Sequence, residues 1–279
     1  MEHKEKNSLV TQGIPLSLTI VSFLFFTLVV YIIIRILNRG ASHAILTKIY
    51  ITDIIVGIII YLKTSVDFAI FIGNLMASYP GWKNRIAIEI STAAGNALGT
   101  IMILVIWNYF RTVEWLLAIM ILIAALVLIK LAEDGMDHVG EEGKNLPEMF
   151  RPFAKIVKKY LAKFNHITHP FLKLIIPNLS MKPQKSKSWG GLFILSFTIP
   201  FILGLDDFAG YVPVFNIVNV FGFSVGVLLG HMILNLLLFI SPERTIKAVK
   251  NPLISLFGSI AFIALAGWGF YEVFKIFFK

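Results

Sequence analysis

The sequence predicts an all-α polytopic membrane protein with seven transmembrane helices, arranged as one N-terminal helix followed by a 3+3 inverted repeat. Three observations predict this class. First, 57% of the 279 residues are hydrophobic and only 15% are charged, whereas soluble domains carry about 25% charged residues. Second, seven apolar segments reach the length of about 20 residues that a spanning helix needs. Third, each half of the chain carries one polar island inside an apolar run.

Each predicted spanning helix is an apolar run bounded by polar residues. The first, at residues 14–37, is too long for a signal-peptide core and lacks a convincing small-residue cleavage site, so we expect a retained helix. The six that follow are predicted at residues 50–77, 85–109, 113–131, 189–211, 214–240 and 252–277.

These segments divide the chain into four parts. They are a tail with the first helix at 1–44, a first three-helix repeat at 45–132, a linker at 133–188 and a second three-helix repeat at 189–279. Lys and Arg near helix ends mark the cytoplasmic side, and most of them lie on the side that holds the N-terminus and the linker. We therefore expect a multi-pass protein of the cell (inner) membrane, with N-terminus and linker cytoplasmic and the C-terminus outside. A further span, formed if the second helix splits at Lys63, would move the C-terminus to the other side.

The two polar islands are the strongest functional signal. One runs from Lys63 to Ala69 and contains Asp67, and the other runs from Gly204 to Ala209 and contains Asp206. A charged side chain at bilayer depth costs about 2.5–3.5 kcal/mol on insertion scales, so both carboxylates need a functional reason. We predict that they form one site built twice. The Lys-Thr-Ser break before Asp67 and Pro200 before Asp206 are expected to interrupt their helices.

The repeat extends to the next helix of each half. Gly95 and Gly99 in the third helix match Gly226 and Gly230 in the sixth. Three helices are an odd number, so the two halves enter the membrane from opposite sides, and such repeats place substrate near the midplane. The glycine pairs alternatively mark only close helix packing, which would also bring these helices against the Asp-bearing ones.

Polar side chains follow one face of three predicted helices, by their helical spacing. The three stripes are Lys63, Asp67 and Asn74; Glu89, Thr92, Asn96 and Thr100; and Ser224, His231 and Asn235. Carboxylate, amide and imidazole groups suit a hard or borderline divalent cation such as Mn²⁺. The predicted metal ligands are Asp67, Asp206, Asp207, Asn74, Asn96, His231 and Asn235, with Lys63 as gate or charge partner.

Several of these residues also have structural explanations. Lys63 alternatively neutralises Asp67 in an ion pair. Glu89 lies one turn from Arg85, so we expect it to be solvated near the interface. His231 is alternatively a hydrogen-bonded packing residue.

The linker contains a predicted basic amphipathic helix within residues 147–179. Its apolar side chains recur at helical spacing with lysines between them, which indicates binding to anionic lipid head groups of the bilayer. A docking arm for a membrane-protein partner is the alternative, and a homo-oligomer is also considered. The net charge of the chain is +9, which basic membrane proteins typically owe to Lys and Arg in their cytoplasmic loops. Because no soluble basic domain is evident, we expect no nucleic-acid partner. The chain has no cysteine, which excludes disulfides and thiolate metal sites.

The chain resembles the TerC family, within the LysE-type superfamily of small exporters, in three segments: Ser65–Gly73, the turn from Pro80 to Arg85, and Gly204–Ala209. The resemblance covers about residues 50–277, and it implies a seven-helix membrane protein tied to manganese export and tellurite resistance. The family motifs are Asp-Asn in the first half and Asp-Ser in the second. This chain has Asp67-Phe68 and Asp206-Asp207 at those positions.

The sequence therefore predicts a secondary transporter that exports a divalent cation in exchange for protons, with an Mn²⁺-like ion as substrate and no resident cofactor. One alternative is a non-transporting membrane subunit that anchors or assembles a larger complex, and another is an exporter of a small organic solute. An enzyme is not expected, because the chain has neither a nucleotide-binding loop nor a recognisable nucleophile–base motif.

Overall fold

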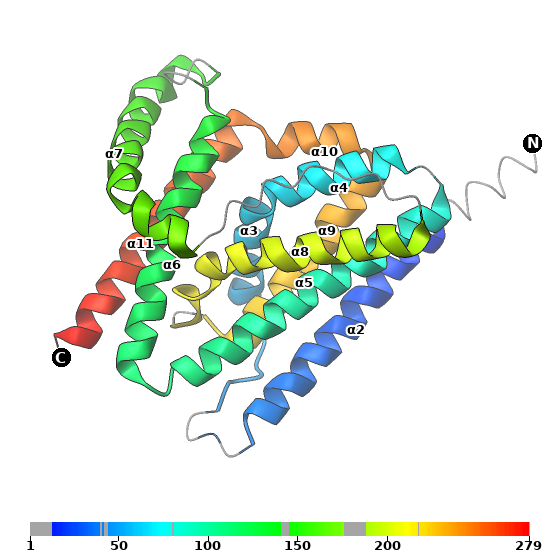
Figure 1. Cartoon of the computed structure of the whole chain (residues 1–279), viewed down its shortest axis with the longest axis horizontal. Coiled ribbons are helices and arrows are strands. Elements are labelled where there is room, and N and C mark those ends of the chain that lie inside the picture. The colour runs from blue at the N-terminus through cyan, green and yellow to red at the C-terminus, as the bar shows by residue number, and fades with distance from the viewer. Residues whose placement is uncertain are drawn as a thin grey trace, which may run out of the picture. The chain divides into compact units, whose positions relative to one another are not determined.

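A computed structural model of the chain describes residues 13–39, 41, 44–79, 81–140, 145–175, 188–216 and 218–278. Within these ranges every regular element is a helix (Figure 1), so the all-α class is confirmed. The side chains of Asp67, Asp206 and Asp207 lie outside the described residues.

In the described part of the chain, five helices are long and apolar enough to cross a membrane, and they make the chain a multi-pass membrane protein. They are α2 (Ile14–Leu37), α5 (Trp82–Phe110), α6 (Glu114–Asp137), α9 (Val220–Ile240) and α11 (Pro252–Phe277). Helices α3 (Ile51–Thr64) and α4 (Val66–Ser78) form a sixth if the bent pair is one span. The count of seven spans, the repeat and the orientation in the membrane stay predictions.

Local sequence sets the helix ends. Asn251 caps α11 by accepting hydrogen bonds from the backbone N–H groups of Leu253 and Ile254, and Pro252 occupies the first turn. Asn219 caps α9 in the same way. Helix α9 therefore begins at Val220 rather than at the predicted residue 214, and a short 3₁₀ turn, η4 (Val214–Asn216), precedes it.

The two predicted interruptions have opposite outcomes. The helix that carries the first island breaks at Ser65, where α3 and α4 meet at a bend of 67°, so this prediction is confirmed. The prediction at Pro200 is wrong, because α8 (Trp189–Tyr211) continues through it. Membrane helices tolerate an internal proline because neighbouring groups satisfy the backbone carbonyl that it frees.

The contacts group the chain into two compact units. The first unit contains α2, α3, α4, α9 and most of α5 and α8, and the second contains α6, α7 (Arg151–Ile175), η3 (Glu148–Phe150), η4 and α11. The division into four sequence segments stays a prediction.

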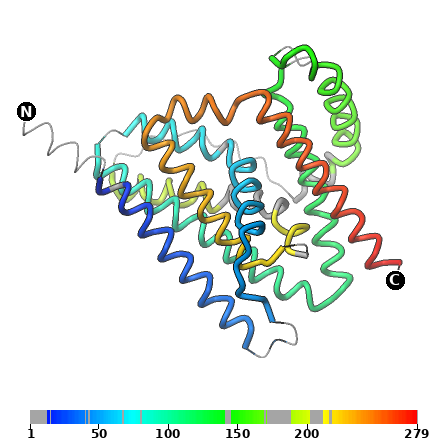
Figure 2. Tube along the Cα trace, turned by 180° about the vertical axis from the view of Figure 1, so that it is seen from behind, coloured from blue at the N-terminus to red at the C-terminus, as the bar shows by residue number. Residues whose placement is uncertain are grey.

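In the first unit, glycines allow two pairs of helices to approach closely. A Cβ added at Gly57 of α3 would lie 2.3 Å from the carbonyl oxygen of Phe223, and one at Gly226 of α9 would lie 2.3 Å from that of Ile54. The two helices therefore run side by side, as Figures 1 and 2 show. A Cβ at Gly95 of α5 would lie 2.4 Å from the carbonyl oxygen of α8 residue Phe197. Of the predicted glycine pairs, Gly95 thus lies against the predicted fifth helix, and Gly226 and Gly230 lie against the predicted second helix, as expected.

In the second unit, α6 and α11 pack together and α7 covers part of the pair. The core of this unit is made of buried apolar side chains from all three helices, including Leu128, Met136, Leu161, Leu256 and Phe262. The predicted linker helix therefore exists, and one of its faces packs against the spanning helices.

Candidate functional site

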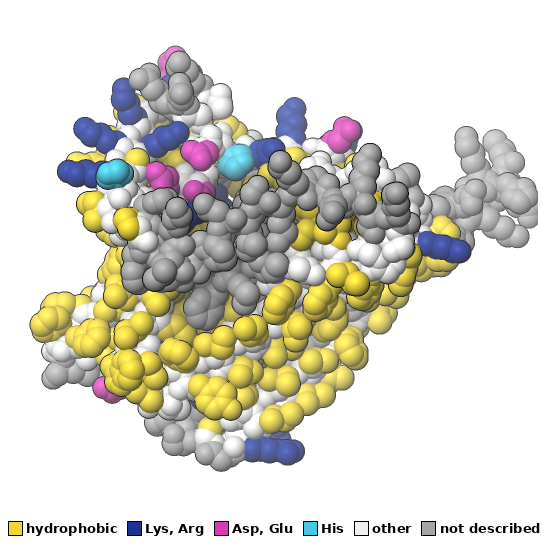
Figure 3. Space-filling view, viewed as in Figure 1, with side chains coloured by type: hydrophobic (Ala, Val, Ile, Leu, Met, Phe, Trp, Pro, Cys, Tyr) yellow, Lys and Arg dark blue, Asp and Glu magenta, His cyan; other side chains and the backbone are white. Residues whose placement is uncertain are grey.

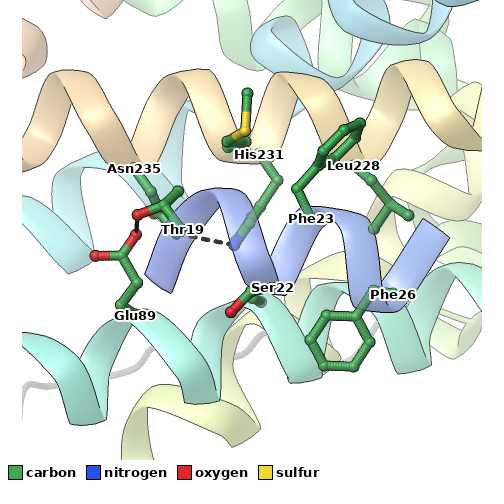
Figure 4. Close-up of a pocket in the computed structure, with 10 residues that line it drawn as sticks. Thr19, Ser22, Phe23, Phe26, Glu89, Leu228, His231 and Asn235 are labelled. Carbon is green, nitrogen blue, oxygen red and sulfur yellow. Dashed lines mark hydrogen bonds between the residues drawn. The ribbon is translucent and has the colours of Figure 1, made fainter. Parts of the chain in front are cut away.

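A pocket in the first unit lies among α2, α5 and α9 (Figure 4). It holds about 270 Å³ of space outside the atoms, including the part open at its mouth. Most of its lining is apolar, but polar side chains enter it from all three helices. The lining residues are Thr19, Ser22, Phe23, Phe26, Glu89, Ala93, Leu228, His231, Met232 and Asn235.

The carboxyl group of Glu89 is the most unusual feature of this pocket. Glu89 lies inside a spanning helix, and it is only 1% exposed. Its Oε1 accepts a hydrogen bond from the Thr19 hydroxyl of α2, and its buried Oε2 has no hydrogen-bond partner among the described residues. The expectation that Glu89 is solvated is therefore wrong, because side chains of α2 and α9, including Thr19, lie around its carboxyl group. The guanidinium of Arg85 lies over the ring of Phe239 at 4.7 Å instead.

His231 and Asn235 form a hydrogen-bonded network beside this carboxyl group. Nδ2 of Asn235 donates to Oγ1 of Thr92 at 3.2 Å and lies 2.9 Å from Nε2 of His231. The Tyr61 hydroxyl lies 2.7 Å from Nδ1 of the same imidazole. If Nε2 accepts from Asn235, the neutral ring carries its proton on Nδ1 and donates it to Tyr61. Both ring nitrogens are then engaged, so a metal ion would have to displace one of these partners.

Asn235 also contributes a second unpaired acceptor to the pocket. Its Oδ1 is buried, and no described residue donates a hydrogen bond to it. Glu89 and Asn235 thus each bring one acceptor oxygen that lacks a donor, and buried polar atoms of this kind are rare unless a proton, water or ion satisfies them. The arrangement is suited to binding a cation or a proton.

The structure brings together only part of the predicted metal site. His231 and Asn235 lie together, and the stripe of α5 joins them through Thr92. Asn96 is buried on α5, where its Nδ2 has no hydrogen-bond partner within the described ranges. Asn74 is exposed on α4, and Lys63 is half-buried on α3.

The three predicted aspartate ligands, Asp67, Asp206 and Asp207, have side chains outside the described residues. In the part of the chain that the structure describes, no group of three or more His, Asp and Glu side chains could hold a metal ion.

Sequence reasoning missed three polar residues of this region. Thr19 and Ser22 lie in a strongly apolar helix, and their signal in the sequence is the i, i+3 spacing that places them on one face. The Tyr61 hydroxyl pairs with His231, a residue 170 positions away. Such a distant partner has no signal in the local sequence.

Comparison with known proteins identifies no relative of this chain. No family model, curated protein or solved structure matches this chain. The resemblance to the TerC family therefore stays a prediction, and the function must be inferred from the chemistry of the site.

Asp53 is a second buried carboxylate in this unit. It is 6% exposed at the start of α3, with its side chain against Gly222 of α9. Its buried Oδ2 has no hydrogen-bond partner in the part of the chain that the structure describes.

Proposed function

We propose that this chain is a secondary membrane transporter that binds a cation in the Glu89 pocket and exchanges it for protons. The observation that carries the proposal is the buried carboxyl group of Glu89, with one oxygen unpaired inside a spanning helix. Ionisable groups in membrane helices are costly, and they typically mark substrate or proton pathways. A carboxyl group in this position can hold either a proton or a cation, which is the chemistry that exchange requires.

The ligands in the pocket favour a hard cation. Glu89 offers a carboxylate oxygen, Asn235 an amide oxygen, and Thr19 and Ser22 hydroxyl oxygens. Oxygen ligands of these types suit Mg²⁺, Ca²⁺ and Mn²⁺. Both nitrogens of His231 already have partners. The ion therefore binds to the side-chain oxygens of the pocket, and His231 links α9 to α3.

Asp67 and Asp206 stay in the proposal as the predicted carboxylates of the broken helix and its counterpart. The export of an Mn²⁺-like ion remains the proposed direction and substrate.

The pairing of helices supports the inverted repeat on which this proposal draws. The predicted second helix, α3, packs on the sixth, α9, while the third, α5, packs on the fifth, α8. If the two halves of the repeat are exchanged, the second helix takes the place of the fifth and the sixth that of the third. The α3–α9 pair then becomes the α8–α5 pair. The fourth and seventh helices, α6 and α11, form the remaining pair. An inverted repeat is expected to pair its helices in this way.

The break at Ser65 gives the proposed transporter a place to bend. His231 contacts residues on both sides of it, because the rings of Tyr61 and Phe68 lie 5.7 and 5.4 Å from the imidazole. A change in the angle between α3 and α4 would therefore alter the surroundings of His231. Asn235 passes that change to Thr92, whose hydroxyl donates to the backbone oxygen of Glu89. We propose this chain of contacts as the link between helix bending and the pocket.

The test is cation-driven proton movement in liposomes that contain the purified chain and a trapped pH-sensitive dye. We expect Mn²⁺ gradients to drive proton flux with the wild-type chain. Glu89→Gln should abolish that flux while leaving folding intact, because the amide keeps the shape and an acceptor for Thr19. Glu243→Gln, at an exposed site on α10 (Pro242–Val249), is the matched control and should behave as wild type. Wild-type flux in Glu89→Gln, or no flux with any divalent cation in the wild type, would refute the proposal.

A further inference from the structure

Helix α7 has a second apolar face that is largely exposed in the described structure, although the ring of Phe164 lies 6.3 Å from that of Phe270 on α11. Its buried face, with Ala154, Val157 and Leu161, packs on the core of the second unit. A different set of large apolar side chains is 37–78% exposed. This set comprises Met149 of η3 and Phe153, Ile156, Tyr160, Phe164 and Ile167 of α7.

The exposed apolar residues form a stripe. At 100° per residue, they fall within a sector of about 80° around the helix axis. Lys159 and Lys163 lie beside this sector on its far side from the buried face, and both are exposed. Figure 3 shows Lys and Arg side chains gathered over α7. The helix thus has three sectors: one packed on protein, one apolar and exposed, and one basic.

Contacts with α6 place α7 at the edge of an apolar span. Nδ2 of Asn165 donates to Oε2 of Glu133 at 2.6 Å and to the backbone oxygen of Ile129 at 3.4 Å. Further along, Lys158 pairs with Asp137 at 3.9 Å. The uncharged apolar run of α6 ends at Ile129, and charged residues follow it. Helix α7 therefore lies beside the point where α6 passes from apolar to charged sequence, which is where a membrane–water interface is expected.

We propose that the exposed apolar sector of α7 rests in the head-group region of the bilayer, with Lys159 and Lys163 bound to anionic lipids. Apolar side chains next to lysines on a helix at the interface are the features that bind such a surface, and charged lipid head groups attract basic segments near the membrane. This inference is independent of the proposed transport, because it concerns the second unit alone.

The absence of cysteine allows a direct test by single-cysteine spin labels on the full chain in liposomes. Labels at Ile156 and Tyr160 report the apolar sector, and a label at exposed Ala162 reports the basic side. A label at Leu24 of α2, which is 60% exposed within a spanning helix, gives the reference for lipid contact. Accessibility is measured with oxygen, which partitions into lipid, and with a water-soluble nickel chelate.

We expect labels at Ile156 and Tyr160 to respond to oxygen as the label at Leu24 does, and the label at Ala162 to respond to the nickel chelate. Adding phosphatidylglycerol to phosphatidylcholine liposomes should increase this contrast, and the double variant Lys159→Gln/Lys163→Gln should lose the increase. Equal nickel accessibility at all three α7 positions would overturn the inference. Shielding of Ile156 and Tyr160 from both reagents would also overturn it, because a protein partner would then cover the face. If the difference in accessibility between these labels does not change when phosphatidylglycerol is added, the role of the anionic lipid is overturned.

Discussion

The Tyr61 hydroxyl of α3 lies 2.7 Å from Nδ1 of His231 on α9. Tyr61 is four residues before the break at Ser65. This hydrogen bond joins the broken helix to the network that reaches Thr92 beside Glu89. It is therefore the contact through which bending of the α3–α4 pair would reach the pocket.

Removing this hydroxyl tests the contact. Tyr61→Phe leaves the buried Nδ1 of His231 without a partner, so we expect the free energy of unfolding to fall by about 1–3 kcal/mol. Unfolding by SDS in mixed micelles measures the change. Tyr271→Phe, at a position 56% exposed on α11, is the control and should have little effect. Equal stability of the two variants would show that the Tyr61–His231 bond does not form.

The close packing of α3 on α9 predicts that Gly57 cannot be enlarged. A methyl group there would meet the backbone oxygen of Phe223 at 2.3 Å, and overpacking of this kind costs about 1–3 kcal/mol or more. Gly57→Ala should lower the thermal midpoint of the purified protein. Gly267→Ala on α11 meets nothing within 4 Å and should leave the midpoint unchanged or higher, since alanine favours helix. A Gly57→Ala midpoint at or above wild type would contradict the packing described for these helices.

The donor to Glu89 gives a prediction about affinity rather than stability. Thr19→Val keeps the side-chain volume and removes a hydroxyl that lines the pocket and bonds to Oε1 of Glu89. If the pocket binds the cation, the concentration for half-maximal flux should rise several-fold, with a smaller change in maximal flux. Thr112→Val, at an exposed position between α5 and α6, is the comparison. An unchanged half-maximal concentration in Thr19→Val would remove Thr19 from the binding site.

The aspartates of the two islands provide a separate prediction. We expect expression of the chain to confer tolerance to Mn²⁺. Asp67→Asn and Asp206→Asn should each abolish this tolerance, while the protein still accumulates in the membrane. Asn74→Ala, an exposed position on α4, should retain tolerance. Full tolerance in both aspartate variants would leave the islands without a role in transport.

The positions of the long helices were largely predictable because hydrophobic length decides where membrane helices form. The bounds predicted for the first and last helices, 14–37 and 252–277, agree with α2 and α11. The break at Ser65 was also predictable, because three polar residues interrupt one apolar run. The predicted interruption at Pro200 was wrong because proline lowers helix stability less in a packed membrane helix than in water.

The site was less predictable than the fold. Periodicity correctly grouped His231 with Asn235 and Glu89 with Thr92, because helical spacing fixes which residues share a face. It could not show that α2 covers Glu89, since burial of one helix face depends on which other helix packs there. The pairing of Tyr61 with His231 likewise depends on contact between distant segments.

The most direct test of the central claim is proton release on cation binding. Mn²⁺ is added to the purified chain in weakly buffered detergent solution, and the protons released per protein are measured with a pH indicator. If Glu89 exchanges a proton for the cation, the wild type and Glu243→Gln should release protons as Mn²⁺ saturates the site, and Glu89→Gln should release none. Equal proton release by Glu89→Gln and the wild type would contradict the account.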